Sequence, residues 1–474
     1  MARLWALLVV GLVGCQAPQD RQETDAHIAA IESELKPRLV IRGEPVETET
    51  LAERMERLGV PGVSIAVIND GAIEWARGYG SADVESGRPV TTTTLFQAAS
   101  ISKPVAATAA LKFVQDGLID LDEDVNGKLV SWKVPENEFT EAQPVTLRGL
   151  VTHTAGMTVH GFPGYARAEE VPSTIGVLDG EGNTDPIRVD MEPRSEWRYS
   201  GGGYTVMQHL LTDIAGSPFP EIMREIVLEP FGMSESTYEQ PLPEARWEQA
   251  ATGYQSDGKE VEGKWHTYPE MAAAGLWTTP TDLARFAIAI QDANAGESEA
   301  VLSTEMARQM LTPDMNSHGL GPAIMGGGAR FGHGGSNEGF RCTFTAFIEG
   351  GSGAAIMTNS DNGGALAQEI LVNIGIEYGW PGFEQDERVV VELEPAVYEE
   401  LAGRYNIPPA GVVTLEYVDG RLWADATFIE RVELLPESDT VFFTRDAGNR
   451  VTFVREDGRV VAFLVQGTRA ERVE

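Results

Sequence analysis

Cysteine is scarce in this chain of 474 residues, which contains two, Cys15 and Cys342. Two cysteines cannot by themselves supply the four ligands of a structural zinc site. The seven histidines show neither the H-E-x-x-H nor the H-x-H-x-D spacing of a catalytic zinc site. A G-x-S-x-G segment, which would indicate an α/β-hydrolase nucleophile, is also lacking. We therefore expect no metal site and no cofactor.

The chain also has few positively charged residues. The chain has 36 Lys and Arg against 72 Asp and Glu, a net charge of −36. A field of that sign repels phosphate backbones, so we expect no nucleic-acid partner. The simplest interpretation of the charge is solubility, and it indicates no particular site. Hydrophobic residues make up 42%, which is enough for a sizeable core.

The apolar run at the N-terminus, Leu4–Val13, is too short to span a bilayer as a mature helix. It follows one positive charge and ends in residues 12–15 (LVGC). Small residues before a cysteine at this place resemble the bacterial lipobox. The resemblance implies a lipoprotein signal peptide at residues 1–14, lipidation of Cys15 and a polar tether at residues 15–24. Lipid on Cys15 would exclude a disulfide with Cys342.

Gln16 after the cysteine resembles the pattern of lipoproteins sent to the outer membrane of a Gram-negative host. We therefore expect an exported, membrane-anchored protein on the periplasmic side of that membrane. An ordinary secretion signal with an incidental cysteine is the alternative.

Strand signals stand at both ends of a first domain. Asp70-Gly71 separates two β-prone runs, and strand patterns return at 341–347 and 354–357. Between them lie an Ala-rich helix that follows Ser100 and stops near Gly117, helical patterns at 145–157 and 203–215, and a helix capped at Thr281-Asp282. This order suits one antiparallel sheet flanked by helices, with a helical region inserted. We expect this α/β (α+β) domain to cover residues 25–385.

The composition changes after about residue 385. A charged stretch leads to Pro395, and alternating strands follow with turns at Asp419-Gly420 and Asp457-Gly458 and a loop at 446–449. This pattern predicts a small C-terminal all-β domain at residues 390–474, similar to barrel-like domains appended to some relatives of the family named below.

Ser100 and Lys103 are the first candidates for chemistry, in residues 96–103 (FQAASISK). A serine hydroxyl needs a base beside it to act as a nucleophile, and positions three apart share a helix face. A lysine serves as that base if burial lowers its pKa, and its apolar neighbours fit such burial. Alone, this spacing is equally consistent with a capping serine and a surface lysine.

Two further segments support the catalytic interpretation of Ser100 and Lys103. Residues 196–204 (EWRYSGGGY) bring Tyr199 to the start of a helix, and residues 331–339 (FGHGGSNEG) form a glycine-rich segment before a strand. These three elements, in this order, resemble the serine β-lactamase and penicillin-binding-protein superfamily. The nearest branch is the one with class C β-lactamases, D-aminopeptidases, D-Ala-D-Ala carboxypeptidases and related esterases. The resemblance covers about residues 45–365, including 60–64 (VPGVS) and 145–156 (VTLRGLVTHTAG).

The resemblance implies a role for each matching residue. Ser100 would be the acylated nucleophile, with Lys103 and Tyr199 as the proton-relay pair. His333, Gly334 and Gly335 stand where the family has Lys-Thr-Gly or His-x-Gly. The backbone N–H groups of Ser100 and Ser336 would form the oxyanion hole.

Two positions depart from the family pattern. The usual Tyr-x-Asn is Tyr199-Ser200-Gly201 here, so the amide that would hold the lysine and the acyl side of the substrate is missing. His333 replaces a lysine, and neutral imidazole attracts a carboxylate more weakly than an ammonium does. Both changes favour an esterase or amidase over a β-lactamase or carboxypeptidase.

We therefore expect a monomeric serine hydrolase that acts through an acyl-enzyme on a small ester, amide or peptide. A true β-lactamase or D-Ala-D-Ala carboxypeptidase is one alternative, and a non-catalytic cell-wall-binding or sensor lipoprotein is another. Glu338 could meet a substrate ammonium, although a solvated surface residue is the plainer interpretation. His153 is expected to be a structural hydrogen-bonding residue and Cys342 a buried, inert one.

Overall fold

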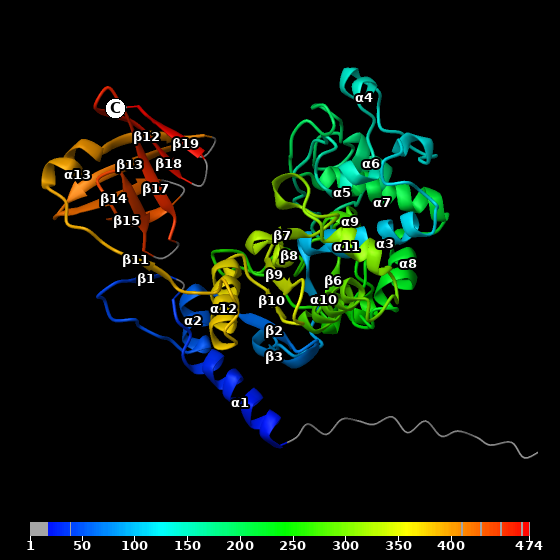
Figure 1. Cartoon of the computed structure of the whole chain (residues 1–474), viewed down its shortest axis with the longest axis horizontal. Coiled ribbons are helices and arrows are strands. Elements are labelled where there is room, and N and C mark those ends of the chain that lie inside the picture. Colours follow the sequence, from blue (N-terminus) through cyan, green and yellow to red (C-terminus); the bar gives the residue numbers. More distant parts are fainter. Residues whose placement is uncertain are drawn as a thin grey trace, which may run out of the picture. The chain divides into compact units, whose positions relative to one another are not determined.

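The computed structural model describes residues 18–37, 39–408, 411–426, 429–445, 448–465 and 468–473. They form two compact units, each described by itself: residues 18–34 with 50–378, and residues 35–49 with 379–473 (Figure 1). The expected signal peptide and Cys15 lie outside the described residues. Residues 18–24, assigned to a tether by the sequence interpretation, lie in helix α1 (Pro18–Ser33). Residues 35–49 join the C-terminal unit, which no sequence pattern indicates.

The first unit is built on a seven-stranded sheet with the order β4-β3-β2-β10-β9-β8-β7. Neighbouring strands run antiparallel. Strands from both ends of the domain therefore share one sheet, as the sequence predicts. The strands are β2 (Gly62–Asn69), β3 (Ala72–Asp83), β4 (Arg88–Pro89), β7 (Ala323–Met325), β8 (Arg330–Asn337), β9 (Phe340–Phe347) and β10 (Gly353–Thr358); β5 (Phe96–Gln97) and β6 (Trp277–Thr278) pair separately.

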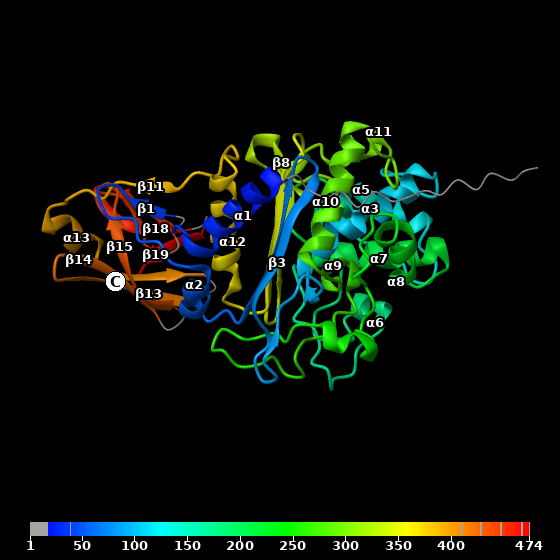
Figure 2. The same ribbon diagram turned by 90° about the horizontal axis from the view of Figure 1, so that it is seen from below.

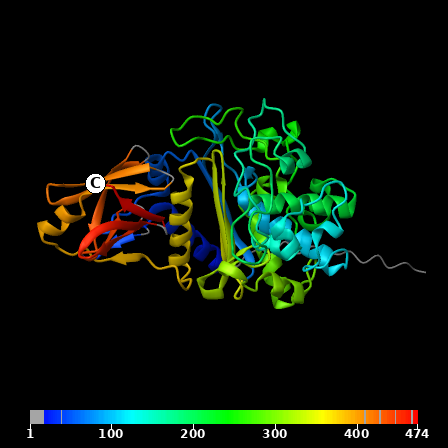
Figure 3. The ribbon, with the colours of Figure 1, turned by 90° about the horizontal axis from the view of Figure 1, so that it is seen from above.

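Helices cover both faces of this sheet (Figures 2 and 3). On one side α12 packs on β9 and β10, with α1 and α2 against it; on the other, α10 packs on β2 and β10. Because both faces are covered, β2 is buried along most of its length and has the apolar sequence VSIAVI. The helices are α2 (Leu51–Leu58), α3 (Ser102–Gln115), α4 (Glu138–Ala142), α5 (Leu147–Val151), α6 (Thr174–Asp179), α7 (Gly201–Ala215), α8 (Phe219–Met223), α9 (Met271–Ala274), α10 (Pro280–Ala295), α11 (Thr304–Met310) and α12 (Gly363–Glu377).

Local signals in the sequence account for most of these boundaries. The turn Asp70-Gly71 joins β2 to β3, and α3 ends at Gln115, just before Gly117. One prediction was wrong: α10 is capped by Thr279, not by Thr281. The Oγ1 of Thr279 accepts the N–H of Asp282, and Pro280 takes the first helical position, where its missing N–H costs nothing.

The second unit is a closed barrel of eight antiparallel strands, β12 to β19, in which β12 also pairs with β19. Its interior is filled by buried aromatic and aliphatic side chains, among them Tyr405, Phe442 and Phe453. The predicted turns Asp419-Gly420 and Asp457-Gly458 join neighbouring strands. The strands are β12 (Gly403–Ile407), β13 (Gly411–Val418), β14 (Arg421–Ala426), β15 (Ile429–Pro436), β16 (Val441–Thr444), β17 (Arg450–Glu456), β18 (Arg459–Val465) and β19 (Thr468–Arg472), with helix α13 (Pro395–Leu401) before them.

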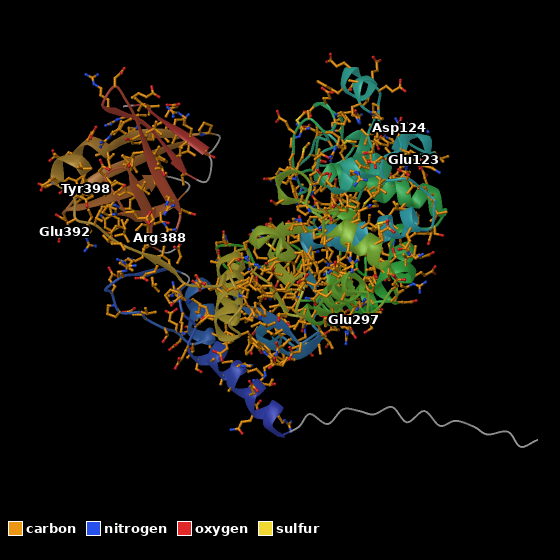
Figure 4. The ribbon with its side chains drawn as sticks, viewed as in Figure 1. Glu123, Asp124, Glu297, Arg388, Glu392 and Tyr398 are labelled. Carbon is orange, nitrogen blue, oxygen red and sulfur yellow. The ribbon has the colours of Figure 1, made fainter. Side chains whose placement is uncertain are left out.

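Strand β1 (Leu39–Ile41) belongs to this second unit, where it pairs in parallel with β11 (Asp386–Arg388). Arg388 (Figure 4) donates from Nη1 to Glu437 over 2.9 Å and from Nη2 to Asp386 over 2.5 Å. The bond to Glu437 attaches β11 to the residue that follows strand β15 of the barrel.

Candidate active site

Ser100 lies in a short 3₁₀ turn, Ala99–Ile101, immediately before α3. Ala99, the residue before it, has a φ of 50°. Residues other than glycine rarely adopt this left-handed backbone, and such strain is concentrated at functional sites. The sequence places Ser100 at the opening of the helix, and the structure places it one turn earlier, on a constrained corner.

Lys103 lies in the first turn of α3 with its side chain turned back to this corner. Its Nζ donates to the Oγ of Ser100 over 3.0 Å and to the carbonyl of Ala273 over 2.8 Å. The residue is 2% exposed, and burial lowers the pKa of the Lys103 ammonium to about 7. At neutral pH a substantial fraction of the amine is therefore unprotonated and can accept the serine proton.

Tyr199 ends the loop that leads into α7, and its ring faces the same amine. The centre of the ring is 4.9 Å from the Nζ of Lys103. Burial raises the pKa of the Tyr199 hydroxyl, and a hydrogen bond with Ser100 opposes this rise. The hydroxyl of Ser100 therefore interacts with both Lys103 and Tyr199, the pair to which the family resemblance gives proton transfer.

Strand β8 carries the glycine-rich segment along the other side of the nucleophile turn. A Cβ on Gly335 would lie 2.2 Å from the carbonyl oxygen of Ala98, so any larger residue would push the strand off the turn. Ser336, the next residue of the strand, is exposed. The glycine thus brings β8, with Gly334 and Ser336, against the corner that holds Ser100.

His333 is on β8 as well, and its ring centre is 6.1 Å from that of Tyr199. Its Nδ1 is 2.6 Å from the carbonyl oxygen of Gly334. Burial and the nearby Lys103 lower the pKa of His333 to about 3. The residue that replaces the family lysine is therefore a neutral imidazole, as expected from the sequence.

His318 was not identified from the sequence. Its ring centre lies 4.8 Å from that of His153 and 6.1 Å from that of His333. Burial, with Lys103 nearby, lowers the pKa of His318 to about 4. It comes from the segment before β7, between the second and third motifs, and no spacing in the sequence indicates it.

Two other buried residues, Ala273 and Glu270, were also missed. Ala273 contributes a backbone carbonyl, which no side-chain pattern can reveal. Glu270, three residues earlier, is fully buried, and neither of its carboxyl oxygens has a hydrogen-bond partner among the described residues. Burial raises the pKa of Glu270 to about 8.

The remaining candidates have structural partners. The Nδ1 of His153 accepts the backbone N–H of Ser200, as expected of a structural histidine. Glu338 accepts a hydrogen bond from Gln255 over 2.8 Å. Cys342 is buried on β9, and burial raises the pKa of its thiol to about 12, which fits an inert residue.

Within the described residues, no three His, Cys, Asp or Glu side chains are arranged to hold a metal ion. The same residues include no helix long and apolar enough to cross a membrane.

The profile of the β-lactamase family matches residues 48–375. The chain belongs to the β-lactamase family. A second match, to a domain of unknown function (DUF3471), covers residues 387–472 and so coincides with the barrel. The β-lactamase family is a family of hydrolases, and this membership supports enzyme activity for the chain.

Individual relatives are distant and diverse. Penicillin-binding protein 4* of Bacillus subtilis is 22% identical over 90% of this chain and 96% of its own length. Esterase EstB of Burkholderia gladioli is 29% identical over 44% of this chain and 53% of its own length.

Solved structures show the same fold. An octameric penicillin-binding protein homologue from Pyrococcus abyssi has a TM-score of 0.60 at 23% identity and covers 89% of this chain and 98% of its own. D-amino acid amidase from Ochrobactrum anthropi has a TM-score of 0.57 at 22% identity, covering 69% of this chain and 96% of its own.

Proposed function

We propose that this protein is a serine hydrolase that cleaves a small ester or amide through an acyl-enzyme on Ser100. The observation that carries the proposal is the 3.0 Å hydrogen bond between the Nζ of Lys103 and the Oγ of Ser100. It joins a hydroxyl to a base that is partly neutral at physiological pH.

In the first step, Ser100 attacks the substrate carbonyl while its proton passes to Lys103, with Tyr199 beside both groups. The backbone N–H groups of Ser100 and Ser336 stabilise the oxyanion. Collapse of the tetrahedral intermediate expels the alcohol or amine, which takes up the proton. Water then attacks the acyl-serine ester and gives up its proton to the same base. Collapse of the second tetrahedral intermediate releases the acid, and the base returns the proton to the Oγ of Ser100.

The names of the relatives support an ester or amide substrate, since they include an esterase, a D-amino acid amidase and β-lactamases. The neutral His333 and the absence of a side chain at Gly201 favour an esterase or amidase over a β-lactamase. A panel of nitrophenyl esters, D-alanine anilide and nitrocefin compares these activities. Strong turnover of nitrocefin would favour the β-lactamase alternative.

A fluorophosphonate probe tests the mechanism, because it reacts with an activated serine. We expect one probe adduct by intact mass, located by peptide mapping at Ser100 and absent from the Ser100→Ala variant. Ser195→Ala is the matched control, since this exposed serine lies four residues before Tyr199. Unchanged labelling of Ser100→Ala would exclude Ser100 as the nucleophile.

We also propose that the chain is exported and anchored by lipid on Cys15 at the periplasmic side of the outer membrane. The support is the sequence of residues 1–16 alone. Expression in a Gram-negative host should give a membrane-bound, lipid-labelled protein, and Cys15→Ser should lose the label. The monomeric state stays a prediction.

A further inference from the structure

Gly201, the first residue of α7, has no room for a side chain. A Cβ on this residue would lie 2.9 Å from the Cε2 of Phe162 and 3.1 Å from the carbonyl oxygen of His160. The backbone of Gly201 is helical, so space rather than conformation excludes a larger residue. The ring of Phe162 therefore lies against the position where a side chain at 201 would begin.

Phe162 is held there by the path of the segment that carries it. The N–H groups of Gly201 and Gly202 donate to the carbonyls of His160 and Val159, each over 3.0 Å. Together with the phenyl ring, these bonds fix the segment across the first turn of α7.

Ser200, the N-cap of α7, adds a third attachment. Its Oγ donates to the carbonyl of Thr158 over 2.8 Å. A Cβ on Gly202 would lie 2.6 Å from the same carbonyl oxygen, so the two backbones are in direct contact. Residues 158–162 are thus held against the N-terminus of α7 by backbone contacts as well as by the phenyl ring.

The same segment reaches the catalytic tyrosine. The exposed ring of His160 has its centre 4.9 Å from that of Tyr199. Residues 158–162 therefore place an imidazole beside Tyr199 and a phenyl ring beside Gly201, two positions further along the chain.

We propose that Phe162 and His160 form an aromatic wall on the acyl side of the substrate site. The wall selects substrates whose acyl group is apolar next to the reacting carbonyl, such as aliphatic or aromatic esters. This inference rests on the proposed serine hydrolase activity. An apolar chain gains by burial against the phenyl ring, whereas an amide in the same place meets carbon and loses its hydrogen bonds to water.

A double-mutant cycle tests the proposal with the chain of residues 16–474, which contains both structural units. The variants are Phe162→Ala, Gly201→Asn and the two combined. The probes are the nitrophenyl esters of butyrate and of N-acetylglycine, which differ in the amide next to the carbonyl. The measured quantity is the ratio of their kcat/KM values, corrected for spontaneous hydrolysis.

We expect the wild type to prefer butyrate by about tenfold or more, and Phe162→Ala to reduce this preference about tenfold. Gly201→Asn alone should lower kcat/KM, because its Cβ meets the ring of Phe162. In the Phe162→Ala background it should be less damaging, because only the 3.1 Å approach to the carbonyl oxygen of His160 remains, and the ratio should shift further toward N-acetylglycine. A ratio in Phe162→Ala within about twofold of the wild type would overturn the proposal. Equal damage from Gly201→Asn in both backgrounds would do so too.

Phe139→Ala is the matched control, since Phe139 is also a partly buried residue packed against the same core. It should leave the substrate ratio unchanged. Fluorophosphonate labelling of Ser100 separates the two proposals. If the variants label normally and the ratio does not move, the aromatic wall is wrong and the hydrolase stands; if the wild type does not label, the proposed function fails.

Discussion

The backbone N–H of Ser200 donates to the Nδ1 of His153 over 3.1 Å. An N–H can only donate, so Nδ1 carries no proton and the neutral ring holds it on Nε2. The carbonyl of His153 accepts the N–H of Arg198 over 2.9 Å, and the two ring centres of His153 and Tyr199 are 4.2 Å apart. His153 therefore holds the residues on both sides of Tyr199 as well as the tyrosine ring.

His153→Asn should preserve this role, and His153→Gln should not. The Asn Oδ1 reaches the place of Nδ1, and Asn tolerates the φ of 61° found at this position. We expect Asn to keep kcat within about threefold of the wild type, and Gln to lower it about tenfold to a hundredfold, with KM little changed. Steady-state kinetics on nitrophenyl butyrate measures the effect, and melting temperatures report folding. Equal kcat values for two well-folded variants would exclude positioning through Nδ1.

The pH dependence of the free enzyme should report Lys103. The base acts when it is neutral, and burial lowers its pKa to about 7. As the pH rises through about 7 the ammonium loses its proton, so kcat/KM for an uncharged ester should increase and then level off. The imidazoles of His318, His333 and His153 do not explain this increase, because the pKa values of His318 and His333 are lowered to about 4 and about 3 and that of His153 lies well below its usual range.

Glu270 is the group that could be confused with Lys103, because burial raises its pKa to about 8. Glu270→Gln removes the titration of this carboxyl, and we expect kcat/KM of this variant still to increase near pH 7. If the increase is lost in this variant, it reports Glu270 rather than Lys103. Tyr199 titrates far above this range, because burial raises the pKa of its hydroxyl.

The same carboxyl should make stability depend on pH. With its pKa raised to about 8, folded Glu270 keeps a proton that the unfolded chain has already released. The folded state therefore binds more protons between about pH 4.5 and 8, and its stability falls as the pH rises through this window. The melting temperature of Glu270→Gln relative to the wild type should thus increase by about 5 °C from pH 5 to pH 9.

Differential scanning fluorimetry at pH 5, 7 and 9 measures that difference. Glu349→Gln, at an exposed position between β9 and β10, is the matched control. Its melting-temperature difference from the wild type should not change with pH. A flat difference for Glu270→Gln as well would mean that Glu270 is ionised in the folded protein.

The features that the sequence predicts are those fixed over short distances along the chain. Asp70-Gly71 sets a hairpin locally, and the three-residue spacing of Ser100 and Lys103 places both on one face. The wrong prediction of Thr281 as the N-cap of α10 also concerned a local signal, because Pro280 at the first helical position marks Thr279 as the cap.

What the sequence could not predict depends on contacts between distant segments. His318 and the carbonyl of Ala273 reach the site through tertiary packing, which leaves no periodic pattern. The pairing of β1 with β11 joins strands separated by most of the chain. Gly201 was visible as a departure from the family pattern, but the ring that fills its place follows from the path of residues 158–162.

His333→Lys should change both specificity and pH dependence. A lysine ammonium at this position attracts a carboxylate on the leaving side of a substrate, whereas the neutral imidazole does not. We expect kcat/KM for a carboxylate-bearing substrate, relative to an uncharged ester, to rise about tenfold in low salt and less in high salt. The added cation also disfavours the charged form of Lys103, so the pKa of that residue should fall and the increase in kcat/KM near pH 7 should move to lower pH. His333→Gln, which adds no charge, is the control and should leave both quantities close to those of the wild type. If specificity changes but the pH at which kcat/KM increases does not, the new ammonium lies away from Lys103. If that pH shifts but specificity does not change, substrates do not extend along β8.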